Sequence, residues 1–193
     1  MARPREFDES EALQRALNLF WRHGYEATSL EQLLAATGLS KGSLYHAFGS
    51  KSELFETVLR TYQQMQAADI EHYLASEENP RIAFTRLIEA ITRPTQPGGR
   101  SWGCLTCNSA VELAPHDPAI ARIIADHHQN LEDIFADALA RGQEAGKIRN
   151  ERNVRATASF LVAALSGLQV LARAGAGRTR IEGAKRTVLS LLD

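Results

Sequence analysis

The segment from Thr28 to Phe55 constrains this chain more than any other, because glycines and polar caps divide it into very short helices. In TSLEQLLAATGLSKGSLYHAFGSKSELF, Thr28 and Glu31 fit the capping-box pattern that begins a helix. Leucines at helical spacing follow on one face. Gly38 is then placed to end the helix in the left-handed conformation. The pattern predicts a helix of about two turns with an abrupt stop.

A second short helix is predicted over Lys41–Phe48, with Ser40 as its N-cap and Gly49 as its end. Leu44 and Phe48 lie on its inward stripe. Ser50 and Glu53 then form another capping box, which opens a third helix. The side chains left facing outward are polar or small: Lys41, Gly42, Ser43, Tyr45 and His46.

Two short helices joined by a glycine-containing turn are typical of the helix-turn-helix, whose second helix enters the major groove of DNA. The whole pattern, with Gly38, the short Ser/Lys/Gly-rich second helix, Tyr45, Phe48 and Lys51, resembles the DNA-binding domain of the TetR family of bacterial transcriptional regulators. The alternative is a pair of ordinary capped helices in an α-helical domain. A second helix this polar and this short argues against packing as its purpose.

The resemblance implies an all-α fold with a three-helix DNA-binding domain at residues 1–52 and a larger helical effector-binding and dimerisation domain at 53–193. It also implies that Tyr45, Lys51 and the cap at Thr28 hold phosphates, while residues 41–43 and His46 approach bases. The expected partner is double-stranded DNA carrying a palindromic operator. The residues expected to bind DNA are Thr28, Ser29, Ser40, Lys41, Gly42, Ser43, Tyr45, His46 and Lys51.

Charge limits how DNA can be bound, because the 193-residue chain carries a formal net charge of −1. Residues 1–60 are not basic overall either, and a basic face is the usual footprint of nucleic-acid binding. Lys41 and Lys51, however, have no acidic residue between them, and Arg3 and Arg5 precede the first helix. We therefore expect DNA binding to depend on local charge.

The rest of the chain also reads as helices, over 8–23, 55–75, 81–92, 102–114, 118–144, 153–174 and 178–192. The segment 153–174 is apolar on most faces and must be covered on most faces. We expect it to pair with its twin, together with 178–192, in a homodimer; burial inside its own monomer is the alternative. A two-fold dimer suits a palindromic operator.

The chain shows no signal peptide and no apolar run approaching eighteen residues, so a cytoplasmic location is expected. Cys104 and Cys107 lie three residues apart, on one face of a predicted helix, where the helix dipole can activate a thiol. The segment Gly103–Leu105, with Glu112–Pro115, resembles a TetR subgroup in which some members sense electrophiles or oxidants through a cysteine. Such a sensor, a small helical thiol enzyme, and plain packing of both cysteines are the three readings.

By the same resemblance, a small organic effector binds in the C-terminal helices. No cofactor or metal is expected, since zinc would need four well-spaced ligands. The chain is read as a repressor rather than an enzyme. The expected pocket walls are Phe84, Leu87, Trp102, Cys104, Cys107, Phe135 and Phe160.

Overall fold

The computed structural model describes residues 8–94, 101–148 and 153–192, and within them it contains helices and turns but no strand. The all-α prediction is confirmed. The chain packs as two units, one up to Gln63 and one from Gln64 on. Helix α4, Lys51–Ala75, runs through that boundary and contributes to both units. The assignment of residues 1–52 and 53–193 to separate functions stays a prediction, and Arg3 and Arg5 lie outside the described residues.

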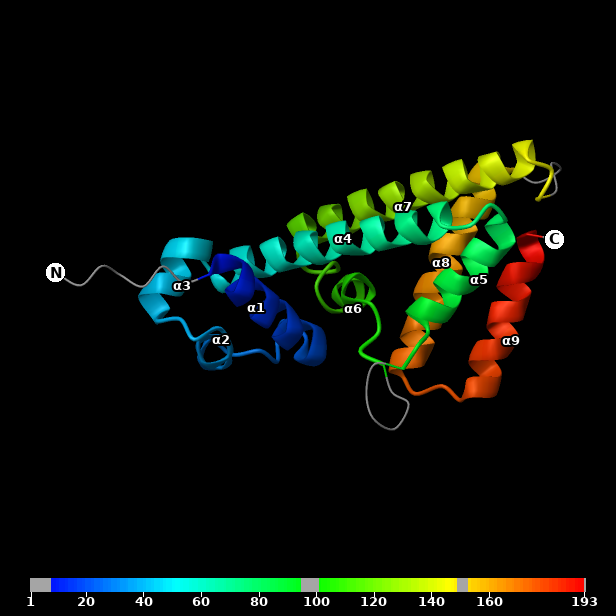
Figure 1. Cartoon of the computed structure of the whole chain (residues 1–193). Coiled ribbons are helices and arrows are strands. Elements are labelled where there is room, and N and C mark those ends of the chain that lie inside the picture. The colour runs from blue at the N-terminus through cyan, green and yellow to red at the C-terminus, as the bar shows by residue number, and fades with distance from the viewer. Residues whose placement is uncertain (1–7, 95–100, 149–152, 193) are drawn as a thin grey trace. The chain divides into compact units, whose positions relative to one another are not determined.

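The first unit consists of α1 (Glu9–His23), α2 (Leu30–Thr37), α3 (Lys41–Phe48) and the beginning of α4. Figure 1 shows these helices in blue to cyan. Aromatic rings form the centre of its core, where Phe20 meets Phe55 edge-on with ring centroids 5.0 Å apart. Leu33 and Leu44 bring α2 and α3 to the same core, since both are completely buried. The short helices are therefore held by tertiary packing, because helices of this length are marginal alone.

The turn between α2 and α3 depends on Gly38, as predicted. Its φ is +74°, the left-handed region in which a side chain is strained, and its N–H donates to the Leu34 carbonyl. The helix therefore stops after two turns, and the chain re-enters a helix at Lys41.

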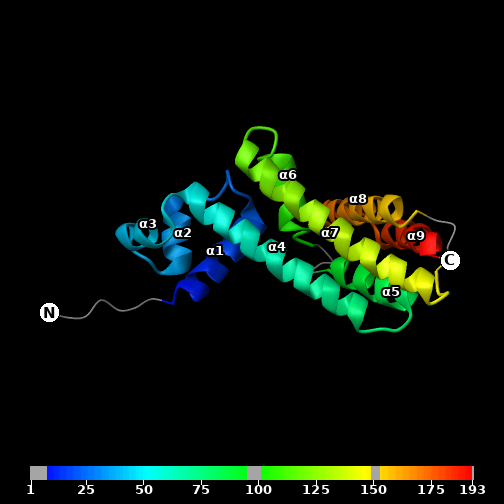
Figure 2. The same cartoon turned by 90° about the horizontal axis from the view of Figure 1, so that it is seen from above.

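The second unit contains the rest of α4, then α5 (Pro80–Ile91), α6 (Leu105–Glu112), α7 (Pro118–Glu144), α8 (Val154–Arg173) and α9 (Arg178–Leu189). A 3-10 turn, Ser190–Leu192, follows α9. Asn79 and Asp117 cap the helices that begin with Pro80 and Pro118, the position where proline is most favourable. Helix α8 contacts α6, α7 and α9, as Figures 1 and 2 show.

Two helix limits differ from the prediction by three residues each. Helix α6 begins at Leu105 rather than Trp102, because Gly103 has a φ of +71° and Cys104 is extended. The last α-helix ends at Leu189 rather than 192. Helix α7 begins and ends as predicted.

Helix α8 buries Leu161, Leu165 and Leu168 inside its own unit. Phe160 and Val170 remain 50% and 46% exposed, so the monomer covers only part of this apolar helix. By length and composition alone, α8 is apolar enough to cross a membrane, a property that core helices share. No apolar run approaching eighteen residues was expected, and α8 contains one by this measure.

Candidate nucleic-acid interface and effector pocket

The cap of α2 lies one residue later than predicted. Ser29, not Thr28, is the N-cap: its hydroxyl accepts from the Gln32 N–H, and the Gln32 side chain accepts from the Ser29 N–H. Thr28 is 1% exposed and donates to the Gly24 carbonyl at 2.6 Å. The capping role given to Thr28 and Glu31 was therefore wrong, and Ser29 is the exposed hydroxyl at this helix start.

Helix α3 presents a polar surface, since Lys41, Gly42, Tyr45 and His46 are exposed. Ser40 caps the helix by accepting from the Ser43 N–H at 3.1 Å. A Cβ added at Gly42 would meet only the Ser40 hydroxyl, at 3.9 Å, outside the helix backbone, so this position is open to close approach. Among the described residues, none covers this face.

Lysine ammonium groups lie close to two tyrosine rings of the first unit. Lys51 Nζ is 4.2 Å from the Tyr25 ring centroid, and Lys41 Nζ is 5.9 Å from that of Tyr45. Lys51 is the first residue of α4, where the helix dipole is positive. Ser50 and Glu53 form the predicted capping box at this end, with hydrogen bonds of 2.7 and 3.1 Å. Lys51 is thus placed where a phosphate would be favoured.

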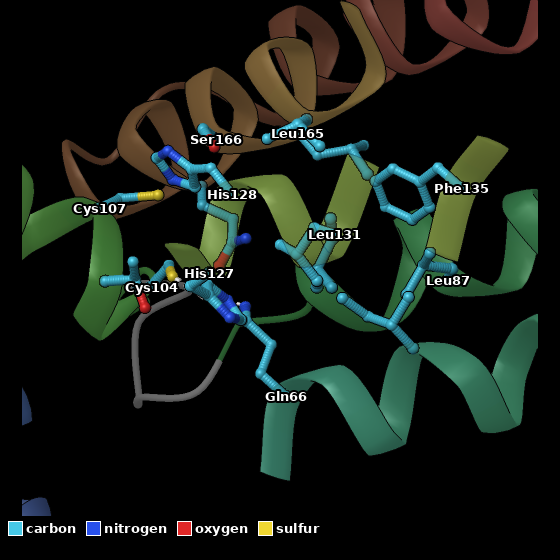
Figure 3. A pocket seen from close by; sticks show the side chains of 15 residues that line it. Gln66, Leu87, Cys104, Cys107, His127, His128, Leu131, Phe135, Leu165 and Ser166 are labelled. Carbon is cyan, nitrogen blue, oxygen red and sulfur yellow. Dashed lines mark hydrogen bonds between the residues drawn. The ribbon is translucent and has the colours of Figure 1, made fainter. Parts of the chain in front are cut away.

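A pocket lies inside the second unit, between the later part of α4 and helices α5 to α8 (Figure 3). The space open to water within it is about 20 Å³, little more than one water molecule needs. Its walls are mixed, with apolar and neutral polar side chains. They are Gln66, Ile70, Leu87, Ile91, Cys104, Thr106, Cys107, His127, His128, Leu131, Phe135, Val162, Leu165, Ser166 and Gln169.

Polar contacts gather at one end of the pocket, where Gln66, His127 and Cys104 meet, while Leu87 and Phe135 lie at the other end (Figure 3). The Nε2 of His127 is 3.0 Å from Gln66 Oε1, and Gln66 Nε2 is 3.6 Å from Cys104 Sγ. Burial, followed by the nearby His128, lowers the pKa of His127 to about 4. His127 is therefore neutral at pH 7, and its Nε2 donates to the amide oxygen.

Both cysteines are buried thiols that form no disulfide. Cys104 is the N-cap of α6, and Cys107 lies in the first turn. Contact with Cys104, followed by burial, raises the pKa of the Cys107 thiol. The expected activation by the helix dipole therefore does not prevail at Cys107. Among the residues that the structure describes, no three potential ligands are grouped to hold a metal ion.

Four of the seven predicted wall residues line this pocket: Leu87, Cys104, Cys107 and Phe135. Phe84 is fully buried and packs against Phe135, with ring centroids 5.6 Å apart. Trp102 is half-buried outside the lining, and its carbonyl accepts from Asn108. Phe160, also predicted as a wall residue, lies outside this lining and is half exposed on α8.

Six polar members of the lining were missed as pocket residues: Gln66, Thr106, His127, His128, Ser166 and Gln169. Gln66 carried a usable signal, because it lies one helical turn before Ile70, on the buried stripe of α4. His127 lies 61 residues from Gln66 along the chain. Sequence spacing could not reveal that these two side chains meet.

An open apolar groove runs between α8 and α9, on the surface of the second unit. Small residues form part of its floor, and beyond the Cα of Gly167 there is open space. It is lined by Ala164, Gly167, Leu168, Val170, Leu171, Ala184, Thr187 and Val188.

Two family matches cover most of the chain. Residues 12–58 match the family described as bacterial regulatory proteins, tetR family, and residues 81–188 match the tetracyclin repressor-like C-terminal domain. The chain is 31% identical to the uncharacterized HTH-type transcriptional regulator YezE of Bacillus subtilis, over all of both proteins. It is 34% identical to the HTH-type transcriptional repressor ComR of Escherichia coli, over 98% of this chain and 90% of that protein.

Solved structures agree with these matches. A cysteine mutant of the TetR family transcriptional regulator CifR, complexed with 26-bp double-strand operator DNA, aligns over all of both chains with a TM-score of 0.86 and 28% identity. Reduced NemR of Escherichia coli has the same fold, with a TM-score of 0.86, 21% identity and coverage of 95% of this chain and 96% of that one. The resemblance of Gly103–Leu105 to a particular subgroup is not confirmed. The chain belongs to the TetR family and is a DNA-binding transcriptional regulator.

Proposed function

We propose that this regulator is a homodimeric repressor that binds a palindromic operator through α3 and leaves it when a small organic effector occupies the pocket. The main support is α3 itself, which uses Leu44 for packing and exposes Lys41, Gly42, Tyr45 and His46. An exposed polar helix of two turns, held by its neighbours, suits a major groove. The related ComR is named as a repressor.

The roles within this surface divide by position. Tyr45, Lys51 and Ser29 contact phosphates, and these contacts fix the orientation on the duplex. Lys41, Gly42, Ser43 and His46 face base edges, with Gly42 allowing the backbone to come close. Ser40 holds the start of α3. Thr28 acts through its buried hydrogen bond, which supports the cap at Ser29.

Dimerisation would use α8 and α9. Phe160 and Val170 are large apolar side chains that the monomer leaves about half exposed, and the groove beside them has a floor of small residues. Small residues let a second helix approach closely, and burial of the exposed apolar side chains drives association. Within the segment 178–192, which was expected to pair with its twin, Ile181, Val188 and Leu192 are buried in their own unit.

Effector control would act through α4. Gln66 lies in the pocket on this helix, which begins at Lys51, a proposed phosphate contact. An effector that binds more tightly when α4 is in one position than in another shifts the protein towards that position. Effector and operator then change each other's affinity by the same coupling free energy.

Substitution of Lys51 and His46 tests the proposed roles. Lys51→Ala should weaken binding to all duplexes alike and lower the salt dependence by about one unit of slope. His46→Ala should change the preferred bases at one position in each half-site. Sequence profiles measured for both variants by selection from random duplexes decide between these outcomes. Identical profiles for both variants would contradict the division.

A thiol sensor is the second candidate function. It is favoured by the position of two thiols that form no disulfide at the polar end of the pocket, where Cys104 contacts Gln66. An electrophile that adds to Cys104 sulfur, with release of the thiol proton, would displace Gln66. If an electrophile lowered the operator affinity of Cys104→Ser as much as that of the native protein, sensing through Cys104 would be ruled out. The alternative of a small helical thiol enzyme would require that the protein catalyse thiol–disulfide exchange.

A further inference from the structure

Charged side chains are missing from the lining of the pocket as the structure describes it. No aspartate, glutamate, lysine or arginine contributes to the wall. Burial lowers the pKa of both His127 and His128, so these imidazoles are uncharged at neutral pH. A charged ligand would lose its hydration here without meeting an opposite charge in the lining, which is strongly unfavourable; Glu132, whose charge acts on His128, lies outside the lining. The wall therefore selects against ions of either sign.

Thr106 contributes a hydrogen-bonding group that no described protein atom uses. Its residue is 1% exposed, and its Oγ1 atom has no hydrogen-bond partner in the part of the chain that the structure describes. Buried hydroxyls are nearly always paired, because an unpaired one costs free energy. A hydroxyl in a pocket wall that lacks a protein partner is a place for a ligand to bond.

The opposite end of the pocket is apolar. Leu87, Leu131 and Phe135 form its surface there, each less than one tenth exposed (Figure 3). Because the open space is about 20 Å³, any ligand larger than water must move side chains. The contacts of Gln66 to Cys104 sulfur, at 3.6 and 3.9 Å, are weak, so its bond of 3.0 Å to His127 Nε2 is the main one that a ligand must replace if it moves this side chain.

We propose that the effector is an electrically neutral molecule with an apolar body and one amide-like or hydroxyl-like end. Its polar end hydrogen-bonds Thr106 Oγ1, and its apolar body lies against Leu87, Leu131 and Phe135. This inference rests on the proposed effector role of the pocket and names the chemical class that the pocket accepts.

Three probes of nearly equal size and different charge test the class: benzamide, benzoate and benzylammonium. Each is titrated at pH 7 into protein labelled at its Leu, Val and Ile methyl groups, to about 10 mM, a range suited to ligands this small. Benzamide should shift the methyl signals of Leu87 and Leu131 and bind at least about tenfold more tightly than either ion. Equal or tighter binding of an ion, or no pocket shift with any probe, would overturn the proposal.

Thr106→Val tests the polar end, because valine keeps the shape and removes the hydroxyl. The fold should not suffer, since that hydroxyl has no partner to lose. Benzamide should bind about fivefold to tenfold more weakly, the loss of one hydrogen bond. Ser109→Ala is the matched control: it removes a buried hydroxyl from the same helix, bonded to the Leu105 carbonyl and outside the lining. Equal weakening in both variants would contradict the role of Thr106.

Operator binding by the same preparations separates this inference from the proposed function. A protein that binds DNA normally but takes up an ion as readily as benzamide refutes the ligand class alone. A protein that binds benzamide in the pocket but no DNA refutes the proposed regulator and leaves the ligand class intact.

Discussion

Val170→Glu should abolish the proposed dimer without unfolding the monomer. Val170 lies on α8 and is 46% exposed, so burial by a twin would cover about half of its side chain. Losing that burial in both protomers costs about 1.5 kcal/mol. Two partly desolvated carboxylates add at least about 3 kcal/mol. The dimer dissociation constant should therefore rise by about a thousandfold or more.

Sedimentation equilibrium over a range of protein concentrations measures this change. Val111→Glu is the control, because Val111 is 77% exposed on α6, away from the groove, and its variant should dimerise normally. Circular dichroism should show equal helicity in both variants. If the dissociation constant of Val170→Glu stayed within about threefold of the native value, α8 would not form the interface.

Three further predictions concern stability and capping. Gly142→Ala should destabilise the protein by about 1 to 3 kcal/mol in urea unfolding, because its Cβ would lie 2.7 Å from Ile148 Cδ1 and 2.9 Å from Pro80 Cγ; unchanged stability would refute the close packing. Ser29→Ala should cost about 1 kcal/mol by loss of the bond from the Gln32 N–H, whereas Glu31→Ala should not; equal losses would contradict the corrected cap. The pKa of His127 falls from 6.5 to about 4 in the folded protein, so the native state binds fewer protons and stability is lost as pH falls from about 6.5 towards 4. This loss of stability is at most about 3 kcal/mol and nearer 1 to 2 after solvent screening. In urea titrations at several pH values it should be absent from His127→Gln. If that variant kept the pH dependence of the native protein, the loss would not come from His127.

Local signals carried most of the fold. Gly38, Ser50 with Glu53, and Pro118 with Asp117 lie at helix ends that backbone chemistry prescribes, so those limits could be predicted closely. The predicted N-cap of α2 was one residue too early, because Thr28 and Ser29 both offer a hydroxyl. Tertiary packing decided between them by burying Thr28 against the Gly24 carbonyl.

The candidate sites divide in the same way. Residues of the α3 surface lie close together in the sequence, so the periodicity of the helix was enough to predict which of them are exposed. The pocket combines residues from five helices, so its members depend on how those helices pack. Phe160 has the composition of a wall residue, yet its place on α8 turns it outward. Gln66 meets His127 only because α4 and α7 fold together, a contact that no spacing encodes.

Selection of bound duplexes from a random pool by the reduced protein tests the central claim most directly. We predict enrichment of a palindrome with half-sites about one helical turn, 34–36 Å, or a multiple of it apart. His46→Ala should alter the enriched bases, and Val170→Glu should lose the palindrome. Enrichment of no sequence by a folded dimer, or of an asymmetric single site, would contradict the account of a two-fold symmetric operator-binding regulator.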